Sequence, residues 1–502
     1  MMERVRSTIA AAIEAKPSPD GAELQALPSD VDWLEVRADL VGDVDADWLR
    51  ARFAGSLLYS LRSTVEGGTG DASSVERRAR LIDAARTYDL VELEGDRDLL
   101  PEVLEAVHPD ARVISWHGSA DGLGRLKARF ERFAKTPARL YRFVSAVERT
   151  GDELASLALL NALDRSDTIA YAAGPVGFWT RLLAPRIGCP IVFGGIDRAE
   201  RGGEPSVFRL LNDYGLPLLL PVQQLFGIVG SRAYHSRSPH LHNAAYRALD
   251  FRALFVPWPT DSFDDFWTRI VDADELRGLG MSLNGVTVAS PHKEEALMRA
   301  SVVSTMARRA GSSNVLVRCG SGWKADTTDP DGVLPLLQER GIRVDRQRAA
   351  VVGCGGSGRA VAASLQIAGA DVTLVNRGLE RGRRAMKLLG LDFVPLNDFS
   401  VDGYSVIVNA TPVGTEPGEM PFQVDGLDEH ATVVDHVYSD HPTSLMETTR
   451  ALGHAAIEGR EILLAQVRRQ FQLMLGIEMP STSFPELAGL EPWGTAAVRS
   501  GV

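Results

Sequence analysis

Residues 349–377, AAVVGCGGSGRAVAASLQIAGADVTLVNR, contain an apolar run, a glycine turn, a helical stretch and a second apolar run. Gly353, Gly355 and Gly358 follow the first run in G-x-G-x-x-G spacing, with Gly356 between them. Glycines in this pattern let the backbone amides at a helix N-terminus approach a pyrophosphate, because no Cβ atom intervenes. The stretch therefore predicts a βαβ unit that binds a dinucleotide.

The end of the second apolar run indicates which dinucleotide this is. Asn376 and Arg377 stand where an Asp or Glu would accept hydrogen bonds from a ribose 2′-hydroxyl. An arginine at this position suits a 2′-phosphate, so the sequence predicts NADP(H) as the cofactor. The alternative is an ordinary glycine turn that binds no nucleotide.

Composition limits the remaining classes of protein. The chain has 502 residues, 45% of them hydrophobic and 24% charged, which is typical of a soluble protein with two to four domains. A net charge of −12 argues against nucleic acid and against an anionic membrane surface as partners. No apolar run approaches the roughly 18 residues of a membrane span. We therefore expect a small-molecule partner, and the oligomeric state stays open, a homo-oligomer included.

The cysteines indicate the compartment. Cys189, Cys319 and Cys354 are scattered and odd in number, so they predict neither a disulfide framework nor a zinc site. We expect a reducing cytoplasm and no bound metal. The first residues, MMERVRSTIAAAIEAKPSPD, have an apolar piece too short and too interrupted by charge for a secretory signal.

The first 215 residues alternate short apolar runs with helical patterns, which predicts an α/β fold of parallel βα units. Eight runs are expected to be strands: Arg4–Ala10, Asp32–Arg37, Ser56–Leu61, Tyr88–Leu93, Arg112–Trp116, Arg139–Val144, Thr168–Ala173 and Pro190–Gly194. Eight such units in this length predict a (βα)8 barrel, whose site should lie at the C-terminal ends of its strands. The proline-containing piece Tyr214–Val222 is the expected join to the second half.

The second half carries a series of short motifs in a fixed order. They are Gly227-Ile-Val-Gly230, His235-Ser236-Arg237-Ser238-Pro239, Pro291-His292-Lys293, Gly311-Ser-Ser-Asn314, Thr327-Thr328-Asp329, the glycine turn, Asn409-Ala410-Thr411-Pro412-Val413-Gly414, Val434-Asp435-His436-Val437-Tyr438 and Gly459, Gln466 and Phe471. This set resembles the shikimate dehydrogenase family over nearly all of residues 225–480.

The resemblance implies a role for each of these polar residues. Ser236 and Ser238 would hold the substrate carboxylate, and Lys293, Asn314, Asp329 and Gln466 would contact ring hydroxyls, with Lys293 and Asp329 as the catalytic pair. Reduction of a ring ketone by NADPH leaves an alkoxide that must receive a proton, which an ammonium beside a carboxylate can donate. Tyr438 and Thr411 are either site residues or packing at the nicotinamide edge.

The barrel segments are similar to type I 3-dehydroquinate dehydratases, and the order of the two halves resembles the fused bifunctional enzyme of plants. By this resemblance His117 would be catalytic in the barrel, and the substrate would be bound by Glu35, Arg37, Arg62 and Arg181. The family forms an imine through a lysine on the sixth strand, and that step requires an amine.

The barrel departs from the family at this lysine. Arg142 stands at the lysine position, and a guanidinium is no useful nucleophile because it stays protonated at every ordinary pH. Glu200 and Glu204 replace a serine and a glutamine of a later loop. We therefore expect a barrel without ordinary dehydratase activity. Other chemistry, or a different alignment that preserves activity, is the alternative.

The dehydrogenase half also departs from its family, at a position that bears on specificity. Ala289 stands where a substrate-binding threonine is usual, although Thr287 would take that role if the strand register differed by two residues. The loss leaves open a preference for quinate or another cyclitol acid over shikimate. A third hypothesis makes the barrel a module that binds dehydroquinate or dehydroshikimate without converting it.

The resemblance gives the expected domain boundaries. Residues 1–218 form the dehydratase-like barrel, 223–340 together with 450–502 form the substrate-binding domain, and 341–449 form a Rossmann-type NADP domain. The predicted function is an NADP-dependent shikimate dehydrogenase fused to a dehydratase-like barrel, in the shikimate pathway of aromatic amino acid biosynthesis.

Overall fold

The computed structural model describes residues 5–480 apart from residues 71, 120–121, 198–199, 201–203, 220 and 440. The predicted domain ranges 1–218 and 450–502 therefore extend beyond the described residues at both ends of the chain. Contacts divide the chain into two compact units, one of residues up to 228 together with 232–283, and one of 229–231 together with the residues from 284 onward.

The first unit begins with a barrel of eight strands. They are β2 (Thr8–Ile13), β3 (Trp33–Arg37), β4 (Ser56–Ser60), β5 (Leu90–Glu94), β6 (Arg112–Ser119), β7 (Leu140–Ala146), β8 (Thr168–Ala173) and β9 (Ile191–Gly195). Neighbouring strands pair in parallel in the order β8-β7-β6-β5-β4-β3-β2-β9, so the last strand pairs with the first and the barrel is nearly closed. This confirms the predicted (βα)8 architecture.

Most predicted strands differ from the observed ones by one to three residues. The first differs most, because Arg4–Ala10 is observed as β1 (Val5–Arg6) and β2, with Arg4 outside the described residues. β1 pairs antiparallel with β10 (Leu218–Leu219), which lies within the predicted join. The polar Ser7 separates the short β1 from the buried run that enters the barrel.

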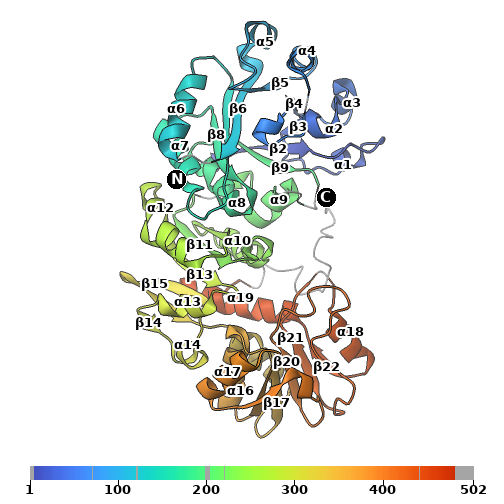
Figure 1. Ribbon diagram of the computed structural model, residues 1–502, viewed down its shortest axis with the longest axis vertical. Helices are drawn as coiled ribbons and strands as arrows, with labels where there is room; N and C mark the ends of the chain where they lie inside the picture. Colours follow the sequence, from blue (N-terminus) through green and yellow to red (C-terminus); the bar gives the residue numbers. More distant parts are fainter. Residues whose placement is uncertain are drawn as a thin grey trace. The chain divides into compact units, whose positions relative to one another are not determined.

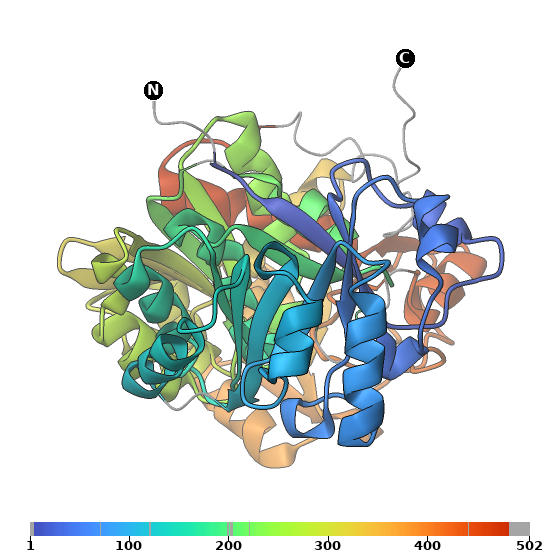
Figure 2. The ribbon, with the colours of Figure 1, turned by 90° about the horizontal axis from the view of Figure 1, so that it is seen from above.

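Helices cover the outside of the barrel strands, as Figures 1 and 2 show. They are α1 (Ala22–Gln25), α2 (Ala38–Val41), α3 (Ala46–Arg50), α4 (Ser74–Ala84), α5 (Pro101–Ala106), α6 (Leu123–Phe133), α7 (Leu154–Leu163), α8 (Gly174–Leu183) and α9 (Val207–Tyr214). The strands are apolar on their outward side, and this side is buried by the helices. Inward positions of several strands carry charged residues, which is where a barrel of this kind builds its site.

The first unit continues beyond the barrel with strands and short helices. They are β11 (Gln224–Gly230), η5 (Ala233–His235), α10 (Ser238–Ala248), β12 (Ala253–Pro259), α11 (Phe263–Phe266), a π-helical turn (Trp267–Asp272) and α12 (Glu275–Gly278). This segment packs on the barrel, with Trp258 of β12 in edge contact with Trp179 of α8 at a ring distance of 5.8 Å.

The second unit begins with four strands of a six-stranded mixed sheet. Its strands β13 (Ser282–Val288), β15 (Val315–Cys319), β16 (Gly322–Asp326) and β14 (Val302–Val303) are neighbours in this order. The connecting helices are α13 (Lys293–Met298) and α14 (Thr305–Ala310), and η7 (Pro330–Gly332) and α15 (Leu334–Glu339) follow β16. The strands place the predicted polar motifs at their ends.

The nucleotide sheet follows. Its strands are β17 (Arg348–Val352), β18 (Asp371–Asn376), β19 (Asp392–Pro395), β20 (Val406–Asn409), β21 (Thr432–Asp435) and β22 (Ala455–Ile457), and its helices are α16 (Gly356–Ile367), α17 (Leu379–Leu389), α18 (Ser444–Ala451) and α19 (Gly459–Leu475). The parallel order β19-β18-β17-β20-β21-β22 is that of a doubly wound dinucleotide fold. Successive residues of β17 are buried on opposite faces, Val351 in one core and Val352 in the other.

Candidate active sites

A buried ion pair lies at the centre of the second unit. Lys293, the first residue of α13, places its Nζ 2.9 and 2.8 Å from the two carboxylate oxygens of Asp329, which precedes η7. The carboxylate is almost fully buried, whereas 13% of the lysine side chain is exposed. The structure thus brings together the two residues predicted to be the catalytic pair.

Two further predicted residues surround this carboxylate. Asn314 Nδ2 lies 3.3 Å from Asp329 Oδ1, and Gln466 Nε2 of α19 lies at the same distance from the same oxygen. Thr328 connects Asn314 to Gln470, because its backbone N–H donates to Asn314 Oδ1 at 2.8 Å and its hydroxyl accepts from Gln470 Nε2 at 3.1 Å. Amide donors around a carboxylate fix its orientation, and Thr328 and Gln470 are members of this network that the sequence analysis missed.

Ser357 is the most direct contact that the sequence analysis missed. It lies in the glycine turn, and the ammonium of Lys293 donates to its Oγ at 2.7 Å. The lysine thus directs its N–H groups to Asp329 and to the nucleotide turn. The contact joins residues 64 positions apart, so no local pattern could have indicated it.

The glycine turn between β17 and α16 has the shape that a pyrophosphate requires. Gly353 has φ of 108°, a conformation that side-chain-bearing residues rarely adopt, and a Cβ on Gly358 would lie 1.8 Å from the carbonyl oxygen of Gly353. Gly355 faces open space, with no atom within 4 Å of a Cβ built there. Backbone amides at the start of this twelve-residue helix are therefore accessible to an anion, so the residues present fit a dinucleotide.

The neighbouring strand ends complete this edge of the sheet. Asn376 Oδ1 accepts from the backbone N–H of Cys354 at 3.1 Å, so its side chain supports the turn, while Arg377 is exposed beside it. The Thr411 hydroxyl donates to Asn409 Oδ1 at 2.7 Å and accepts from the N–H of Val413, which folds the loop after β20. Thr411 therefore has a clear local structural role.

His436 and Tyr438 follow β21. Burial lowers the pKa of His436 to about 4, with Asp329 opposing the shift and Lys293 adding to it, so the imidazole is neutral near pH 7 and lies close to the ion pair. Its Nε2 is buried and has no hydrogen-bond partner within the described part of the chain. Tyr438 is more open, with 37% of its surface exposed. The signal available in the sequence for His436 was a titratable ring directly after Asp435 in the motif Val434–Tyr438.

Ser236 and Ser238 belong to the first unit. Ser236 directly follows η5 and Ser238 begins α10. Both are buried, and the N–H of Ser238 donates to Ser236 Oγ at 3.2 Å. In the second unit, Ala289 follows β13 and its N–H donates to the carbonyl of Val229 at 2.8 Å. Thr287, two residues earlier, is buried within β13.

A second ion pair lies inside the barrel. Arg142 of β7 places one guanidinium nitrogen 2.7 Å from Glu35 Oε1 of β3 and 3.5 Å from Glu92 of β5, and its guanidinium lies 3.7 Å from the centre of the Phe193 ring. Burial alone would raise the pKa of Glu35, but Arg142 and Arg62 lower it to about 2. The arginine at the predicted lysine position is therefore fixed in an ion pair on both of its sides.

His117 of β6 pairs with an acid that is protonated at neutral pH. Its Nδ1 lies 3.1 Å from Glu66 Oε2, and its backbone N–H donates to the same oxygen. Burial and the neighbouring Glu94 raise the pKa of Glu66 to about 9, while burial and Arg62 lower the pKa of His117 well below its ordinary value. Both members of this pair are therefore uncharged near pH 7.

The predicted arginines of the barrel have different surroundings. Arg37 is bidentate to Asp39 at 3.0 and 2.9 Å, and Arg181 donates to the carbonyl of Phe193 at 2.6 Å and pairs with Glu204 at 2.5 Å. Burial and Arg37 lower the pKa of Arg62, whose Nε is buried without a hydrogen-bond partner among the described residues. The carboxylate of Glu204 thus occupies the guanidinium of Arg181, where the resemblance expects a substrate carboxylate.

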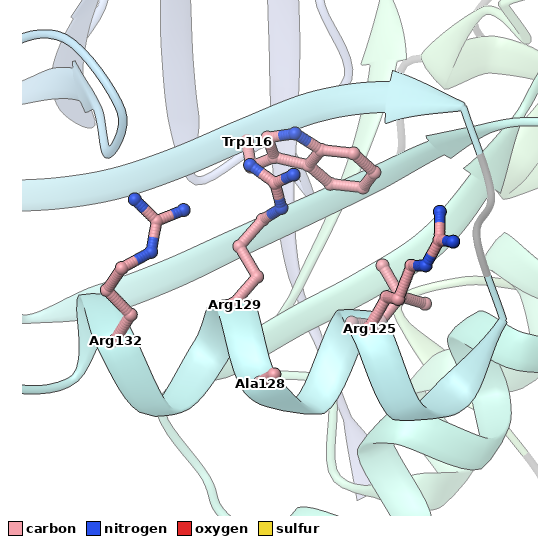
Figure 3. A pocket seen from close by; sticks show the side chains of 6 residues that line it. Trp116, Arg125, Ala128, Arg129 and Arg132 are labelled. Atoms are coloured by element: carbon pink, nitrogen blue, oxygen red, sulfur yellow. The ribbon is translucent and has the colours of Figure 1, made fainter.

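A shallow hollow on the outside of the barrel contains none of the predicted residues. Figure 3 shows Arg125, Arg129 and Arg132 of α6 beside Trp116 of β6. Arg129 stacks on the Trp116 ring at 4.6 Å, and both Arg129 and Arg132 pair with Asp96. These cations are already partnered, so the hollow is not a catalytic candidate.

Two general features bear on the class of protein. No helix within the described residues is long and apolar enough to span a bilayer. Across the same residues, no group of three or more His, Cys, Asp or Glu side chains is arranged to hold a metal ion.

Comparisons with protein families match both halves of the chain. The model of type I 3-dehydroquinase matches residues 14–217, and that of the shikimate dehydrogenase substrate-binding domain matches residues 228–316.

Individual relatives agree with these matches. The bifunctional 3-dehydroquinate dehydratase/shikimate dehydrogenase, chloroplastic, of Arabidopsis thaliana is 25% identical over 500 residues, covering 89% of this chain and 79% of that protein. The shikimate dehydrogenase (NADP(+)) of Halobacterium salinarum is 34% identical over 265 residues, or 51% of this chain and 95% of that protein. A crystal structure of shikimate 5-dehydrogenase from Thermus thermophilus in complex with NADP(H) and shikimate is 28% identical, covers 53% of this chain and 98% of that chain, and has a TM-score of 0.47.

A doubly wound sheet with an open glycine turn beside an ammonium–carboxylate pair defines a dinucleotide-dependent oxidoreductase, here joined to a (βα)8 barrel. The chain belongs to the shikimate dehydrogenase family, and its first half is a type I 3-dehydroquinase domain. The two curated relatives named above carry shikimate dehydrogenase in their names, so the quinate alternative is not favoured.

Proposed function

We propose that the second half of the chain interconverts 3-dehydroshikimate and shikimate with NADP(H). The observation that carries the proposal is the Lys293–Asp329 pair, held by Asn314 and Gln466, in a chain of the shikimate dehydrogenase family. The Lys293 ammonium donates a proton to the ring oxygen on reduction and recovers it on oxidation, while Asp329 holds the ammonium in line. NADP(H), when bound, supplies or accepts the hydride at the ring carbon.

The other predicted residues have binding roles in this proposal. Ser236 and Ser238 bind the substrate carboxylate, and Tyr438 and Thr411 lie at the nicotinamide edge. The cofactor pyrophosphate lies on the glycine turn, and Asn376 and Arg377 face the 2′-phosphate. The exposed position of Arg377 supports this last role, because a phosphate needs an accessible cation.

We also propose that the barrel lacks ordinary dehydratase activity. Imine formation needs an amine, and Arg142 offers a guanidinium that is paired with Glu35. Glu204 occupies Arg181, which the dehydratase resemblance assigns to substrate. Both contacts are made by residues of this chain and occupy groups that a substrate would need. They therefore argue against substrate binding as well as against imine chemistry, and so against the hypothesis of a module that binds dehydroquinate.

Steady-state kinetics with shikimate and quinate, each with NADP⁺ and NAD⁺, test the dehydrogenase. Shikimate with NADP⁺ is expected to give the highest kcat/KM, and absence of turnover with every alicyclic hydroxy acid contradicts the proposal. Arg377→Asp should lower kcat/KM for NADP⁺ by about tenfold or more, since it removes a charge-assisted contact worth about 1.5–3 kcal/mol. Arg384→Asp, on the exposed side of α17, is the control.

Borohydride treatment in the presence of 3-dehydroquinate tests the barrel. An imine would be reduced to a stable secondary amine and would increase the mass of the protein by the reduced ligand less water. We expect no such increase in mass for the natural chain. A stoichiometric adduct would contradict the proposal and would indicate that the barrel can form the imine of a dehydratase.

The compartment and the partners belong to the same proposal. Cys189, Cys319 and Cys354 are all free thiols, which supports a reducing compartment such as the cytoplasm. The net charge of −12 supports a function without nucleic acid. We also propose three domains, which are residues 1–218, residues 341–449, and residues 223–340 together with 450–502.

A further inference from the structure

The last helix of the barrel, α9, lies against the loop that carries Ser236 and Ser238. Both belong to the first unit. The guanidinium of Arg209 lies 4.3 Å from the centre of the Tyr234 ring and 4.9 Å from that of Phe178. Its Nη2 also donates to the backbone carbonyl of Tyr234. Tyr234 precedes Ser236 by two residues, so Arg209 contacts the serine loop through both a ring and a carbonyl.

The barrel fixes Arg209 from the other side. Glu200 Oε2 lies 2.7 Å from Arg209 Nη1, and its Oε1 accepts from the N–H of Ser206, which caps α9. The arginine side chain is only 12% exposed. A planar guanidinium held by a carboxylate and by two rings has little rotational freedom, so it transmits the position of α9 to the loop.

A second contact holds the loop beyond the serines. Asp213 of α9 places Oδ1 2.8 Å from Nδ1 of His240, two residues after Ser238. Farther along α10, Arg247 donates to the carbonyls of Asn212 at 3.0 Å and Asp213 at 3.3 Å. The two serines therefore lie between a contact at Tyr234 and a contact at His240, both made by the same barrel helix.

We propose that Arg209 and Asp213 of the barrel are positioning residues for substrate binding by the dehydrogenase. The inference rests on the proposed function, because it assumes that Ser236 and Ser238 bind the substrate carboxylate. The barrel then contributes to the activity of the second half without chemistry of its own. Its Glu200, at a position where the dehydratase resemblance expects a serine, takes part in this anchoring through Arg209.

The test is Arg209→Gln in the full-length chain. The variant loses the charged contacts to Glu200 and to the Tyr234 carbonyl, so the KM for shikimate should rise roughly 5- to 20-fold. The KM for NADP⁺ should change less than twofold, because the nucleotide turn is untouched. Arg209→Lys keeps the charge without the fork and should recover part of the loss. Asp213→Asn should raise the same KM by a smaller factor.

The matched control is Arg112→Gln. Arg112 is also a buried barrel arginine that donates to backbone carbonyls, but these carbonyls, of Leu104, Val107 and Pro137, all lie within the barrel. The Arg112→Gln variant shows how far a general destabilisation of the barrel changes the KM of the dehydrogenase for shikimate. An equal rise in KM for both variants, or an unchanged KM in Arg209→Gln, overturns the proposal.

Hydrogen exchange separates this inference from the proposed function. In the full-length chain, Arg209→Gln should accelerate amide exchange in residues 233–248 more than Arg112→Gln does. This measurement needs no turnover. If the natural chain oxidises no alicyclic acid, the proposed function fails, but hydrogen exchange still shows whether Arg209 anchors the serine loop. If exchange in residues 233–248 is unchanged in Arg209→Gln and Arg209→Lys, the anchoring fails whatever the activity.

Discussion

The two ion pairs of this protein, Lys293–Asp329 and Arg142–Glu35, are alike in composition and differ in their surroundings. Each joins a cation to a buried carboxylate at less than 3 Å. The lysine retains some exposure and directs one further N–H to a hydroxyl that a ligand can displace, whereas the arginine is only 4% exposed and is enclosed by Glu35, Glu92 and Phe193. Whether such a pair performs chemistry therefore depends on the cation and on its access to a ligand.

The strongest test of this comparison converts the first pair into the second. Lys293→Arg keeps the charge beside Asp329 but replaces a proton donor with a guanidinium, which does not release its proton at ordinary pH. The kcat for shikimate oxidation should fall by about 10²–10⁴, the usual contribution of a positioned acid or base. Steady-state kinetics check this, with Lys324→Arg on the exposed side of β16 as the control. A loss of less than tenfold would remove Lys293 from the catalytic role.

Ser357→Ala sharpens the comparison by removing the third contact of the lysine. The hydroxyl accepts from the ammonium at 2.7 Å, and a hydrogen bond to a charged group contributes about 1.5–3 kcal/mol at most. Because the substrate oxygen replaces part of this contact, we expect a smaller effect, a fall in kcat of about 3- to 10-fold with little change in the KM for shikimate. Ser364→Ala, which removes another buried hydroxyl of α16, should leave kcat unchanged. Equal kinetics for both variants would make Ser357 a packing residue.

The sequence predicted most of the fold and half of the site geometry. Periodic apolar runs were enough for the barrel and for the doubly wound sheet, since both architectures repeat one local unit. The ordered motifs identified Lys293 and Asp329, which the structure brings together. Contacts such as Lys293–Ser357 and Arg142–Glu35 join residues 64 and 107 positions apart. These contacts depend on tertiary packing, which one sequence does not specify.

Substitutions relative to a family pattern were the other source of expectations. Arg142 and Glu204 stood out because they replace residues whose chemistry differs from theirs. What the sequence could not show is that each new residue has a charged partner, Glu35 for Arg142 and Arg181 for Glu204. In a buried setting an unpaired charge is costly, so a buried arginine such as Arg142 needs a partner of this kind nearby.

Glu66 tests whether a carboxyl group inside the barrel stays protonated at neutral pH, in contrast to the ionised Glu35. Its pKa is about 9 in the folded chain, whereas an unfolded glutamate titrates near pH 4.3, as is usual for that side chain. Between these values only the folded state binds the proton, so its contribution to stability is greatest below about pH 4 and falls by about 1.4 kcal/mol per pH unit as pH rises toward 9. Glu66→Gln abolishes this titration.

The measurement is the apparent melting temperature of Glu66→Gln and the natural chain at pH 5 and pH 8. We expect similar values at pH 5 and a melting temperature roughly 8–16 °C higher for the variant at pH 8, since about 4 kcal/mol is lost over these three pH units and about 1 kcal/mol shifts a domain of this size by about 2–4 °C. Glu102→Gln, an exposed acid beside Arg78, is the control. A difference of the same size at both pH values would mean that Glu66 is ionised in the folded protein.

The smallest expected effect comes from replacing the arginine of the second ion pair by a lysine. Arg142→Lys supplies an amine, but Glu35 still holds it as an ammonium and Glu204 still occupies Arg181, so this variant alone should give no borohydride adduct with 3-dehydroquinate. Arg142→Lys combined with Glu204→Gln frees Arg181 for a substrate carboxylate and should give a partial adduct, detected by intact mass. Turnover should stay low, because the loop residue Glu200 is engaged with Arg209. A full adduct in the single variant would show that the missing amine alone silences the barrel, and that the carboxylate of Glu204 does not contribute.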